Sequence, residues 1–328
     1  MQAFRRALLG WYARVKRDLP WRRTRDPYKI WISEIMLQQT RVAAALPFYE
    51  RFLERFPTVE SLAAAAETDV LTHWAGLGYY SRARNLHKAA KAVVADFDGD
   101  FPESYEALLE LPGIGSYTAA AVGSIAFELP RPAVDGNVLR VLARLENDPS
   151  DIGNPQTRVR FTERAEELMG RRHPGEFNQA LMELGATVCL PKSPRCGECP
   201  VQSHCAGFAA GRAGELPVKA RKQADIGIEL TVLLIRNSRS GRILLRQRPA
   251  GSGQMPGFWE LPEAAMVPGA SIGHEIGKVR HAITHHRYVY RVHSAEWSGR
   301  PSKQLAWGIP SEVLLTTATR KALGLLPD

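Results

Sequence analysis

The spacing of apolar residues along the chain changes near residue 215. Up to about Gly211, apolar side chains recur every three or four positions among Ala, Leu, Glu and Arg, as in RFTERAEELMG, which predicts an all-helical region. Further on, IELTVLLIRNSRSGRILLRQRP holds two β-branched runs around a Ser/Gly turn, typical of a hairpin, and RYVYRVHSAEW predicts another strand. We therefore expect a mainly α domain followed by a smaller α+β domain.

The segment 213–226 separates these two patterns. Its sequence, AGELPVKARKQADI, contains Gly, Pro and a basic run but no apolar period, which predicts a linker between domains 1–212 and 227–328. No apolar run approaches the roughly 18 to 20 residues that span a bilayer. The basic N-terminus lacks the apolar core of a signal peptide. We therefore expect no membrane role and a cytoplasmic, nucleoid-associated location.

Charge and cysteine content narrow the chemistry. Lys and Arg outnumber Asp and Glu by 43 to 34, and the net charge of +9 favours a polyanionic partner. All four cysteines, Cys189, Cys196, Cys199 and Cys205, lie in one segment with the spacing C-x6-C-x2-C-x5-C. In a reducing compartment such a cluster indicates metal ligands rather than disulfides. The spacing alone leaves zinc and a 4Fe-4S cluster equally open.

A glycine-containing turn joins two predicted helices at LPGIGSYTAA, residues 111–120. Gly113 and Gly115 flank Ile114 and permit a tight turn, whose backbone NH groups at the following helix N-terminus can bind an anion. Taken alone, the pattern favours an ordinary helix hairpin with a glycine cap. An anion-binding hairpin is the alternative.

Asp135 directly precedes the periodic apolar segment in RPAVDGNVLRVLARL. This position predicts a helix N-cap. At the positive end of a helix the pKa of the carboxyl group is expected to be lowered, which keeps Asp135 anionic. Such an anion can face a developing oxocarbenium ion.

A second carboxyl group lies in WISEIMLQQTRV, where we expect a helix that continues through Arg41. Glu34, Gln38 and Arg41 recur at helical spacing, and most such stripes are solvated faces. Trp31 and Leu37 nevertheless predict partly apolar surroundings for Glu34. Burial of that kind raises the pKa of a carboxyl group, as a general acid requires.

Four motifs of this chain resemble those of one protein family and follow each other in the order found in that family. WISEIMLQQTRV and GLGYYSRARNLHKAA match the signature of MutY-type adenine DNA glycosylases, and LPGIGSYTAA resembles their helix-hairpin-helix element. The cysteine segment, following FNQALMELGATVC, resembles the 4Fe-4S cluster loop of the endonuclease III and MutY group, at residues 189–205 here. The resemblance covers nearly all of residues 1 to 212 and implies a structural 4Fe-4S cluster.

The resemblance also implies a reaction and its residues. The reaction is excision of adenine opposite 8-oxoguanine or guanine in double-stranded DNA, by base flipping, in base excision repair. Glu34 would act as the general acid and Asp135 would stabilise the oxocarbenium ion. The implied adenine pocket consists of Leu19, Trp21, Arg22 and Gln179. The implied DNA contacts are Gln38, Gln39, Tyr79, Leu111, Gly113, Gly115, Lys192 and Arg195.

One position separates this chain from bifunctional members of the endonuclease III group. Those carry a Lys two residues after the second hairpin glycine, which forms a Schiff base with the sugar. Here Gly115 is followed by Ser116 and Tyr117. A phenol cannot form that imine, so we expect a monofunctional glycosylase with Tyr117 in its catalytic site.

The second domain resembles the Nudix-related lesion-reading domain of the same family, most clearly at GFWELPE. A working Nudix hydrolase needs a helix crowded with metal-binding carboxylates. After Pro262 there are only Glu263 and Glu275, far apart. We therefore do not expect nucleotide hydrolysis.

The family's Phe-Ser-His loop appears here as Ile283, Thr284 and His285. The hydroxyl and imidazole groups remain, which assigns 8-oxoguanine recognition to Thr284 and His285. The alternative is that Thr284 merely closes a β-turn.

Two other functions stay open. A DNA-binding metal protein without catalysis would explain the charge, the hairpin and the cysteines, but leaves Glu34 and Asp135 as coincidences. A thymine or oxidised-pyrimidine glycosylase would share the first domain but would not need the second. For the adenine glycosylase we expect a monomer.

Overall fold

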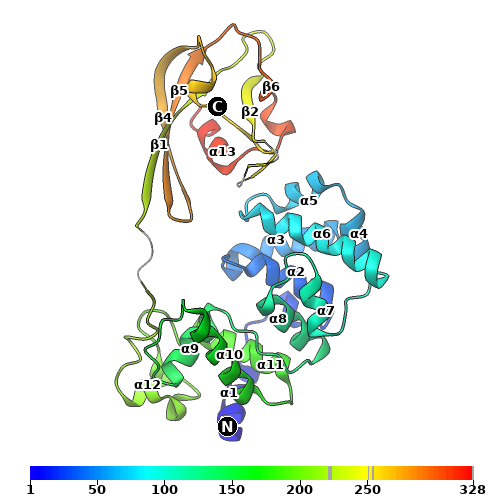
Figure 1. Ribbon diagram of the computed structural model, residues 1–328, viewed down its shortest axis with the longest axis vertical. Helices are drawn as coiled ribbons and strands as arrows, with labels where there is room; N and C mark the ends of the chain where they lie inside the picture. Colours follow the sequence, from blue (N-terminus) through cyan, green and yellow to red (C-terminus); the bar gives the residue numbers. More distant parts are fainter. Residues whose placement is uncertain (221–223, 250, 253–254, 327–328) are drawn as a thin grey trace. The chain divides into compact units, whose positions relative to one another are not determined.

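The computed structural model describes residues 1–220, 224–249, 251–252 and 255–326. The chain divides into two compact units, Met1–Arg221 and Lys222–Asp328 (Figure 1). Among its described residues the first unit contains only helices and connecting loops, and the second combines strands with short helices. The expected order of a mainly α domain and a smaller α+β domain is confirmed.

Local signals define the ends of several helices in the first unit. Asp26 caps α2 by accepting hydrogen bonds from the backbone NH groups of Tyr28 and Lys29, with Pro27 at the first helical position. No helix in the described part of the chain combines the length and apolar character needed to cross a membrane. The main helices are α1 (Gln2–Val15), α2 (Pro27–Leu37), α3 (Val42–Arg55), α4 (Val59–Ala64), α5 (Glu67–Trp74), α6 (Tyr80–Phe97), α7 (Tyr105–Glu110), α8 (Ser116–Phe127), α9 (Gly136–Leu145), α10 (Pro155–Met169), α11 (Pro174–Thr187) and α12 (Ala206–Ala209).

These helices pack as two groups. Helix α1 returns to α9, α10 and α11, where Leu8, Phe161 and Phe177 lie in one buried core. Helix α2 packs against α3, α6 and α8, with the fully buried Trp31 at its centre. Burial of each large side chain contributes roughly 1.5 to 3 kcal/mol to stability. The chain enters the second group after α1 and returns to the first at α9, so loops from both groups face each other (Figure 1).

The expected linker 213–226 begins as part of the first unit. Ala213 and Leu216 are buried. The Nε of Arg144 donates a hydrogen bond to the carbonyl of Leu216 at 2.8 Å. Two apolar side chains in an otherwise polar segment thus extend the helical unit beyond residue 212. Residues 221–223 of this segment lie outside the described part.

The second unit contains two three-stranded sheets, ordered β1-β5-β4 and β3-β2-β6. Strand β1 runs parallel to β5, and β4 is antiparallel to β5. A core that includes Leu245, Val279 and Val292 fills the space beside α13. The elements are β1 (Ile226–Leu234), β2 (Ile243–Gln247), β3 (Trp259–Glu260), β4 (Ser271–Ile283), β5 (His286–Glu296), β6 (Leu305–Gly308) and α13 (Thr317–Leu323).

The hairpin expected in IELTVLLIRNSRSGRILLRQRP is confirmed only next to its turn. There Arg236 bridges Ile243 in antiparallel fashion, and the backbone NH groups of Leu244 and Asn237 donate to the carbonyl groups of Ile235 and Arg242. Farther from the turn the two runs become β1 and β2, which belong to different sheets. Strand β1 instead pairs with β5 along its whole length, because its apolar residues can then reach the core on that side. The strand expected in RYVYRVHSAEW is confirmed as β5.

Candidate active site

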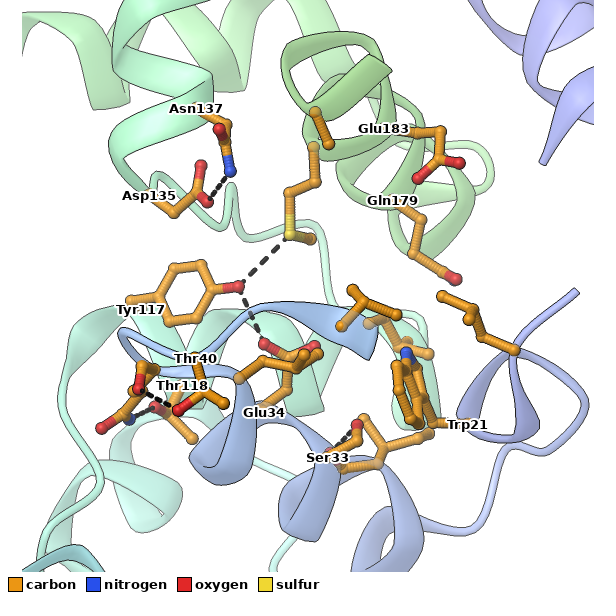
Figure 2. A pocket seen from close by; sticks show the side chains of 18 of the residues that line it. Trp21, Ser33, Glu34, Thr40, Tyr117, Thr118, Asp135, Asn137, Gln179 and Glu183 are labelled. Carbon is orange, nitrogen blue, oxygen red and sulfur yellow. Dashed lines mark hydrogen bonds between the residues drawn. The ribbon is translucent and has the colours of Figure 1, made fainter. Parts of the chain in front are cut away.

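A cavity of about 740 Å³ opens between the two helical groups of the first unit (Figure 2). Its volume is in the range of small-molecule binding sites. The walls come from the 3-10 helix Pro20–Arg22, from α2 and α11, and from the loops before α8 and α9. Among its lining residues are these positions expected from the sequence: Leu19, Trp21, Arg22, Glu34, Gln38, Gln39, Gly113, Gly115, Tyr117, Asp135 and Gln179.

Glu34 points from α2 into this cavity and is only 7% exposed. Burial raises the pKa of Glu34 to about 7. The hydrogen bond from Tyr117 and the charge of Arg22 oppose this shift, whereas the charge of Asp135 adds to it. The raised pKa expected from the apolar neighbours is confirmed, and Glu34 keeps its proton at pH values where an ordinary glutamate is ionised.

Tyr117 stands in the first turn of α8, between the two carboxyl groups (Figure 2). Its hydroxyl donates a hydrogen bond to Oε2 of Glu34 at 2.8 Å and lies 3.2 Å from Sδ of Met182. Burial and the nearby charges of Glu34 and Asp135 raise the pKa of Tyr117 well above its usual value. The phenol of Tyr117 therefore stays protonated, and it orients the Glu34 carboxyl group by donating a hydrogen bond to it.

Asp135 is the N-cap of α9, as expected. Its carboxyl oxygens accept hydrogen bonds from the Val138 NH and the Asn137 Nδ2, both at 2.8 Å. The expected lowering of its pKa is wrong: burial in the cavity wall raises the pKa of Asp135 and outweighs these bonds. The two donors still favour its anion, whereas Glu34 accepts from a single hydroxyl.

The turn between α7 and α8 is tight. Gly113 has φ +77°, and a Cβ there would lie 2.5 Å from the Cβ of Asn85, so the turn requires glycine. The C-cap of α7 is Leu111 and not a glycine, so the glycine-cap interpretation is wrong. The side chain of Leu111 is buried, which leaves its backbone for any contact with DNA. The first NH groups of α8 have no partner within the helix and suit an anion.

The helix expected through Arg41 ends earlier. Gln38 is the C-cap of α2, and Gln39 has a left-handed φ of +57°. The guanidinium group of Arg82 binds the last carbonyl groups of α2 and replaces the next helical turn. Gln38 and Gln39 therefore lie on a turn at the cavity, whereas Arg41 begins α3 as its N-cap.

The opposite wall contains a group that the sequence analysis missed. Glu183, only 1% exposed, accepts from Nη2 of Arg22 at 2.7 Å and from Nε and Nη2 of Arg17 at 2.7 and 2.6 Å. Burial alone would raise the pKa of Glu183, but these two arginines hold it at about 2. Gln179, four residues earlier on α11, accepts from the Tyr12 hydroxyl at 3.0 Å. The one sequence signal for this wall was the spacing of four residues between Gln179 and Glu183, which places both side chains on one face of α11.

Besides the buried Leu111, three expected DNA contacts do not line the cavity. Tyr79 precedes α6 with φ +48° and is 48% exposed. Lys192 and Arg195 are exposed on the cysteine segment, where Arg195 lies 3.9 Å from Glu198. All three are accessible to a polyanion.

Thr284 and His285 form the two-residue turn between β4 and β5 in the second unit. Thr284 is exposed and has φ +52°, which is strained for a β-branched residue. Its hydroxyl donates to the Ile283 carbonyl at 2.7 Å, and Arg287 donates to the carbonyl of Thr284 at 3.1 Å. The His285 ring lies 4.1 Å from that of His286. Thr284 does close a turn, and that turn displays its side chain.

The carboxylates of a Nudix hydrolase helix are not gathered here. Glu275 lies on β4 and pairs with Arg291 at 2.6 Å, and Glu263 lies 3.8 Å from Arg246. Both carboxylates are thus neutralised by arginines on strands.

The four cysteines line a second, smaller cavity beneath the loop that follows α11. Arg144 donates to Sγ of Cys189 at 3.2 Å. A zinc ion needs ligands about 2.3 Å from one point. Four thiols around one cavity also suit a 4Fe-4S cluster, which is held by four cysteines.

Comparisons with known proteins agree with this site. Residues 32–167 match the family described as HhH-GPD superfamily base excision DNA repair protein. Residues 189–205, which contain the four cysteines, match the iron-sulfur binding domain of endonuclease III, which supports a 4Fe-4S cluster as the cofactor. Fold and site thus define a DNA-binding base excision glycosylase with a helix-hairpin-helix and an iron-sulfur cluster.

Similar proteins from other organisms indicate which base the enzyme removes. The adenine DNA glycosylase of Rattus norvegicus is 34% identical over 97% of this chain and 77% of its own length. That of Homo sapiens is 35% identical over 91% and 68%, and that of Mycolicibacterium smegmatis 44% over 62% and 70%. The chain belongs to the adenine DNA glycosylases, base excision repair enzymes that hydrolyse the N-glycosyl bond of adenine.

Solved structures resemble the first unit. A thermostable thymine-DNA glycosylase has a TM-score of 0.57 and 30% identity, covering 64% of this chain and 96% of its own. A non-covalent endonuclease III–DNA complex has a TM-score of 0.53 and 23% identity, covering 64% and 97%, which shows a shared fold. The Rattus norvegicus and Homo sapiens relatives cover 97% and 91% of this chain, whereas these two structures cover 64%.

Proposed function

We propose that this enzyme removes adenine paired with 8-oxoguanine or guanine, and that Glu34 supplies the proton. The observation that carries the proposal is a buried carboxyl group with a pKa of about 7, aimed into a cavity of about 740 Å³. A general acid works best when its pKa lies near the operating pH. Adenine leaves more easily once one of its ring nitrogens is protonated.

The adenosine must leave the base stack to reach this cavity. Flipping costs a few kcal/mol, and side chains that fill the vacated space offset that cost. Gln38 and Gln39 are suited to this role because their turn borders the cavity. Leu19, Trp21, Arg22 and Gln179 line the space into which the base would turn.

Asp135 is proposed to stabilise the positive charge that develops on the sugar when the glycosidic bond breaks. Its two hydrogen bonds from NH donors fix the carboxylate in the cavity wall. A fixed charge in a site with little water stabilises a transition state more than it would in solution. Glu34 and Asp135 then divide the work as the two carboxyl groups of glycosidases do.

The same geometry favours a monofunctional reaction. Among the described residues that line the cavity none is a lysine, and position 117 carries a protonated phenol. A Schiff base with the sugar requires an amine. Water therefore completes the reaction, and the strand stays intact. When bound, the 4Fe-4S cluster holds the loop that carries Lys192 and Arg195, which we propose contact phosphate.

Recognition of 8-oxoguanine is assigned to Thr284 and His285. A strained backbone at an exposed turn supports a functional role, since strain is retained where it serves one. The hydroxyl of Thr284 can donate and accept, and its bond to the Ile283 carbonyl fixes its donor direction. Tyr79 is proposed to wedge beside the lesion.

We also propose that the enzyme acts as a monomer on nucleoid DNA. Light scattering would test the oligomeric state, and microscopy of tagged protein would test the location.

The decisive test is single-turnover excision on three duplexes, with adenine opposite 8-oxoguanine, adenine opposite guanine, and thymine opposite guanine. The proposal predicts the fastest release for the first, slower release for the second and none for the third. Release of thymine would move the enzyme towards the thymine-DNA glycosylase class. Equal rates on the two adenine duplexes would remove the lesion-reading role of the second unit.

A further inference from the structure

Arg82, on α6, joins two loops that are separate in the sequence. Its Nη2 lies 3.4 and 3.3 Å from the carbonyl groups of Leu77 and Gly78, in the loop before α6. The same nitrogen lies 3.5 Å from the Thr40 hydroxyl. Its Nη1 donates to three carbonyls at the end of α2, those of Ile35, Met36 and Gln38, at 2.7, 3.1 and 2.6 Å.

The guanidinium group also packs against two aromatic rings. It lies 5.4 Å from the ring centre of Trp74 and 5.5 Å from that of Tyr79. Trp74 is fully buried and donates from its Nε1 to the Gly78 carbonyl at 3.1 Å. Tyr79 is 48% exposed. Arg82 thus supports one side of the Tyr79 ring and leaves the other accessible.

Carbonyl oxygens, the Thr40 hydroxyl and two aromatic rings surround this cation in the part of the chain that the structure describes. Burial lowers the pKa of Arg82 to about 10. The carbonyl groups at the C-terminal end of α2 supply the compensating negative potential. A lysine could not replace this arrangement, because an ammonium group is a point charge and cannot span acceptors in two loops.

The same helix supports the hairpin turn. Asn85, three residues after Arg82, fills the space beneath Gly113. One face of α6 therefore supports the Gln38–Thr40 turn, the Tyr79 loop and the hairpin turn between α7 and α8.

We propose that Arg82 is a positioning residue that holds the Gln38–Thr40 turn and Tyr79 in one fixed arrangement, so that both enter the base stack together. This rests on the proposed function, in which these segments flank the flipped adenosine and its partner. Arg82 itself touches neither base. Its loss should slow adenine release by letting these two segments move independently, while affinity for undamaged duplex, which depends mainly on phosphate contacts, stays the same.

The test is Arg82→Lys, with Arg55→Lys as the matched control because Arg55 pairs with Asp69 on the surface. Misplacement of catalytic geometry by about 1 Å costs on the order of 100-fold in rate. We expect single-turnover excision opposite 8-oxoguanine to fall by roughly 10 to 100-fold in Arg82→Lys and to be unchanged in the control. An unchanged rate in Arg82→Lys would overturn the proposal.

A double-mutant cycle separates positioning from general destabilisation. In a background of Gln39→Ala and Tyr79→Ala, the Arg82→Lys change should cost less than about twofold, since residues that act together are not additive. A full, additive loss in that background would show that Arg82 acts elsewhere, and would contradict the proposal.

Hydrogen exchange tests the proposal without relying on activity. In Arg82→Lys, or in Arg82→Gln if the lysine variant is insoluble, the amides of residues 38–41 and 77–81 should exchange faster while those of α9 and α11 do not change. Uniform loss of protection, or none, would overturn the proposal. If wild-type enzyme releases no adenine, the proposed function fails, and the exchange pattern still decides the role of Arg82.

Discussion

The cavity of the first unit and the β4–β5 turn of the second unit perform different tasks with opposite surroundings. Glu34 is 7% exposed and its pKa is shifted strongly, whereas Thr284 is exposed and its environment is set by a strained turn. Proton transfer needs an acid tuned by burial. Recognition needs donors and acceptors that an incoming base can reach. We infer that chemistry and lesion reading are separable by mutation.

The largest expected effect is at the acid. Glu34→Gln keeps the shape and removes the transferable proton, so base release should fall by roughly 10² to 10⁴-fold. Affinity for the duplex should hardly change. The measurement is single-turnover excision alongside equilibrium binding. Wild-type turnover by this variant would show that Glu34 is not the acid. The contrast between the cavity of the first unit and the β4–β5 turn would then fail.

A change of mechanism is expected at the position between the two carboxyl groups. Tyr117→Lys places an amine in the cavity, where it can form a Schiff base with the sugar. Borohydride should trap a covalent protein–DNA adduct, and the nicked strand should appear on a denaturing gel. Val159→Lys, at an exposed position of α10, is the control and should give no adduct. Without a trapped adduct for Tyr117→Lys, the sugar does not reach position 117.

Tuning of the acid should also be visible in stability. The folded chain keeps a proton on Glu34 between pH 4.5, its ordinary pKa, and about 7, whereas the unfolded chain releases it. The stabilisation from this group is therefore complete below pH 4.5 and lost as the pH rises through 7. Glu34→Gln should exceed wild type in free energy of unfolding by at most about 3 kcal/mol near pH 8, and match it near pH 4.

Denaturant unfolding at both pH values measures this difference. The exposed Glu106→Gln is the control and should show no such dependence. An equal difference at both pH values would mean that burial does not tune Glu34.

The smallest effect should come from the exposed turn. Thr284→Ala with His285→Ala should narrow the preference for adenine opposite 8-oxoguanine over adenine opposite guanine by roughly tenfold, since a base-edge contact contributes about 1 to 3 kcal/mol. Excision opposite guanine should change little. Single-turnover rates on both duplexes measure the ratio. If the double variant has the same ratio of the two rates as wild type, lesion recognition lies elsewhere, most directly at Tyr79.

The sequence predicted the parts of the site that depend on local pattern. The apolar neighbours of Glu34 predicted its raised pKa, and the position of Asp135 before an apolar run predicted its cap. The helical and mixed units followed from periodicity. Each of these features is encoded within one short segment.

The parts that failed depend on distant partners. Arg82 ends α2 from more than forty positions away, as the separation of 44 between Arg82 and Gln38 shows. Glu183 meets Arg17 across 166 positions. The raised pKa of Asp135 comes from burial that only the assembled cavity provides. The identity of such distant partners is not encoded in local spacing, so the turn at Gln38 and the ion pairs of Glu183 needed the structure.

The pH dependence of single-turnover excision opposite 8-oxoguanine tests the central claim most directly. If Glu34 donates the proton, the rate should fall about tenfold per pH unit above its pKa of about 7, and it should also fall at low pH, where Asp135 takes up a proton. In Glu34→Gln the residual rate should not follow this curve. A wild-type rate that stays level or rises between about pH 7 and 9 would show that the buried carboxyl group is not the acid.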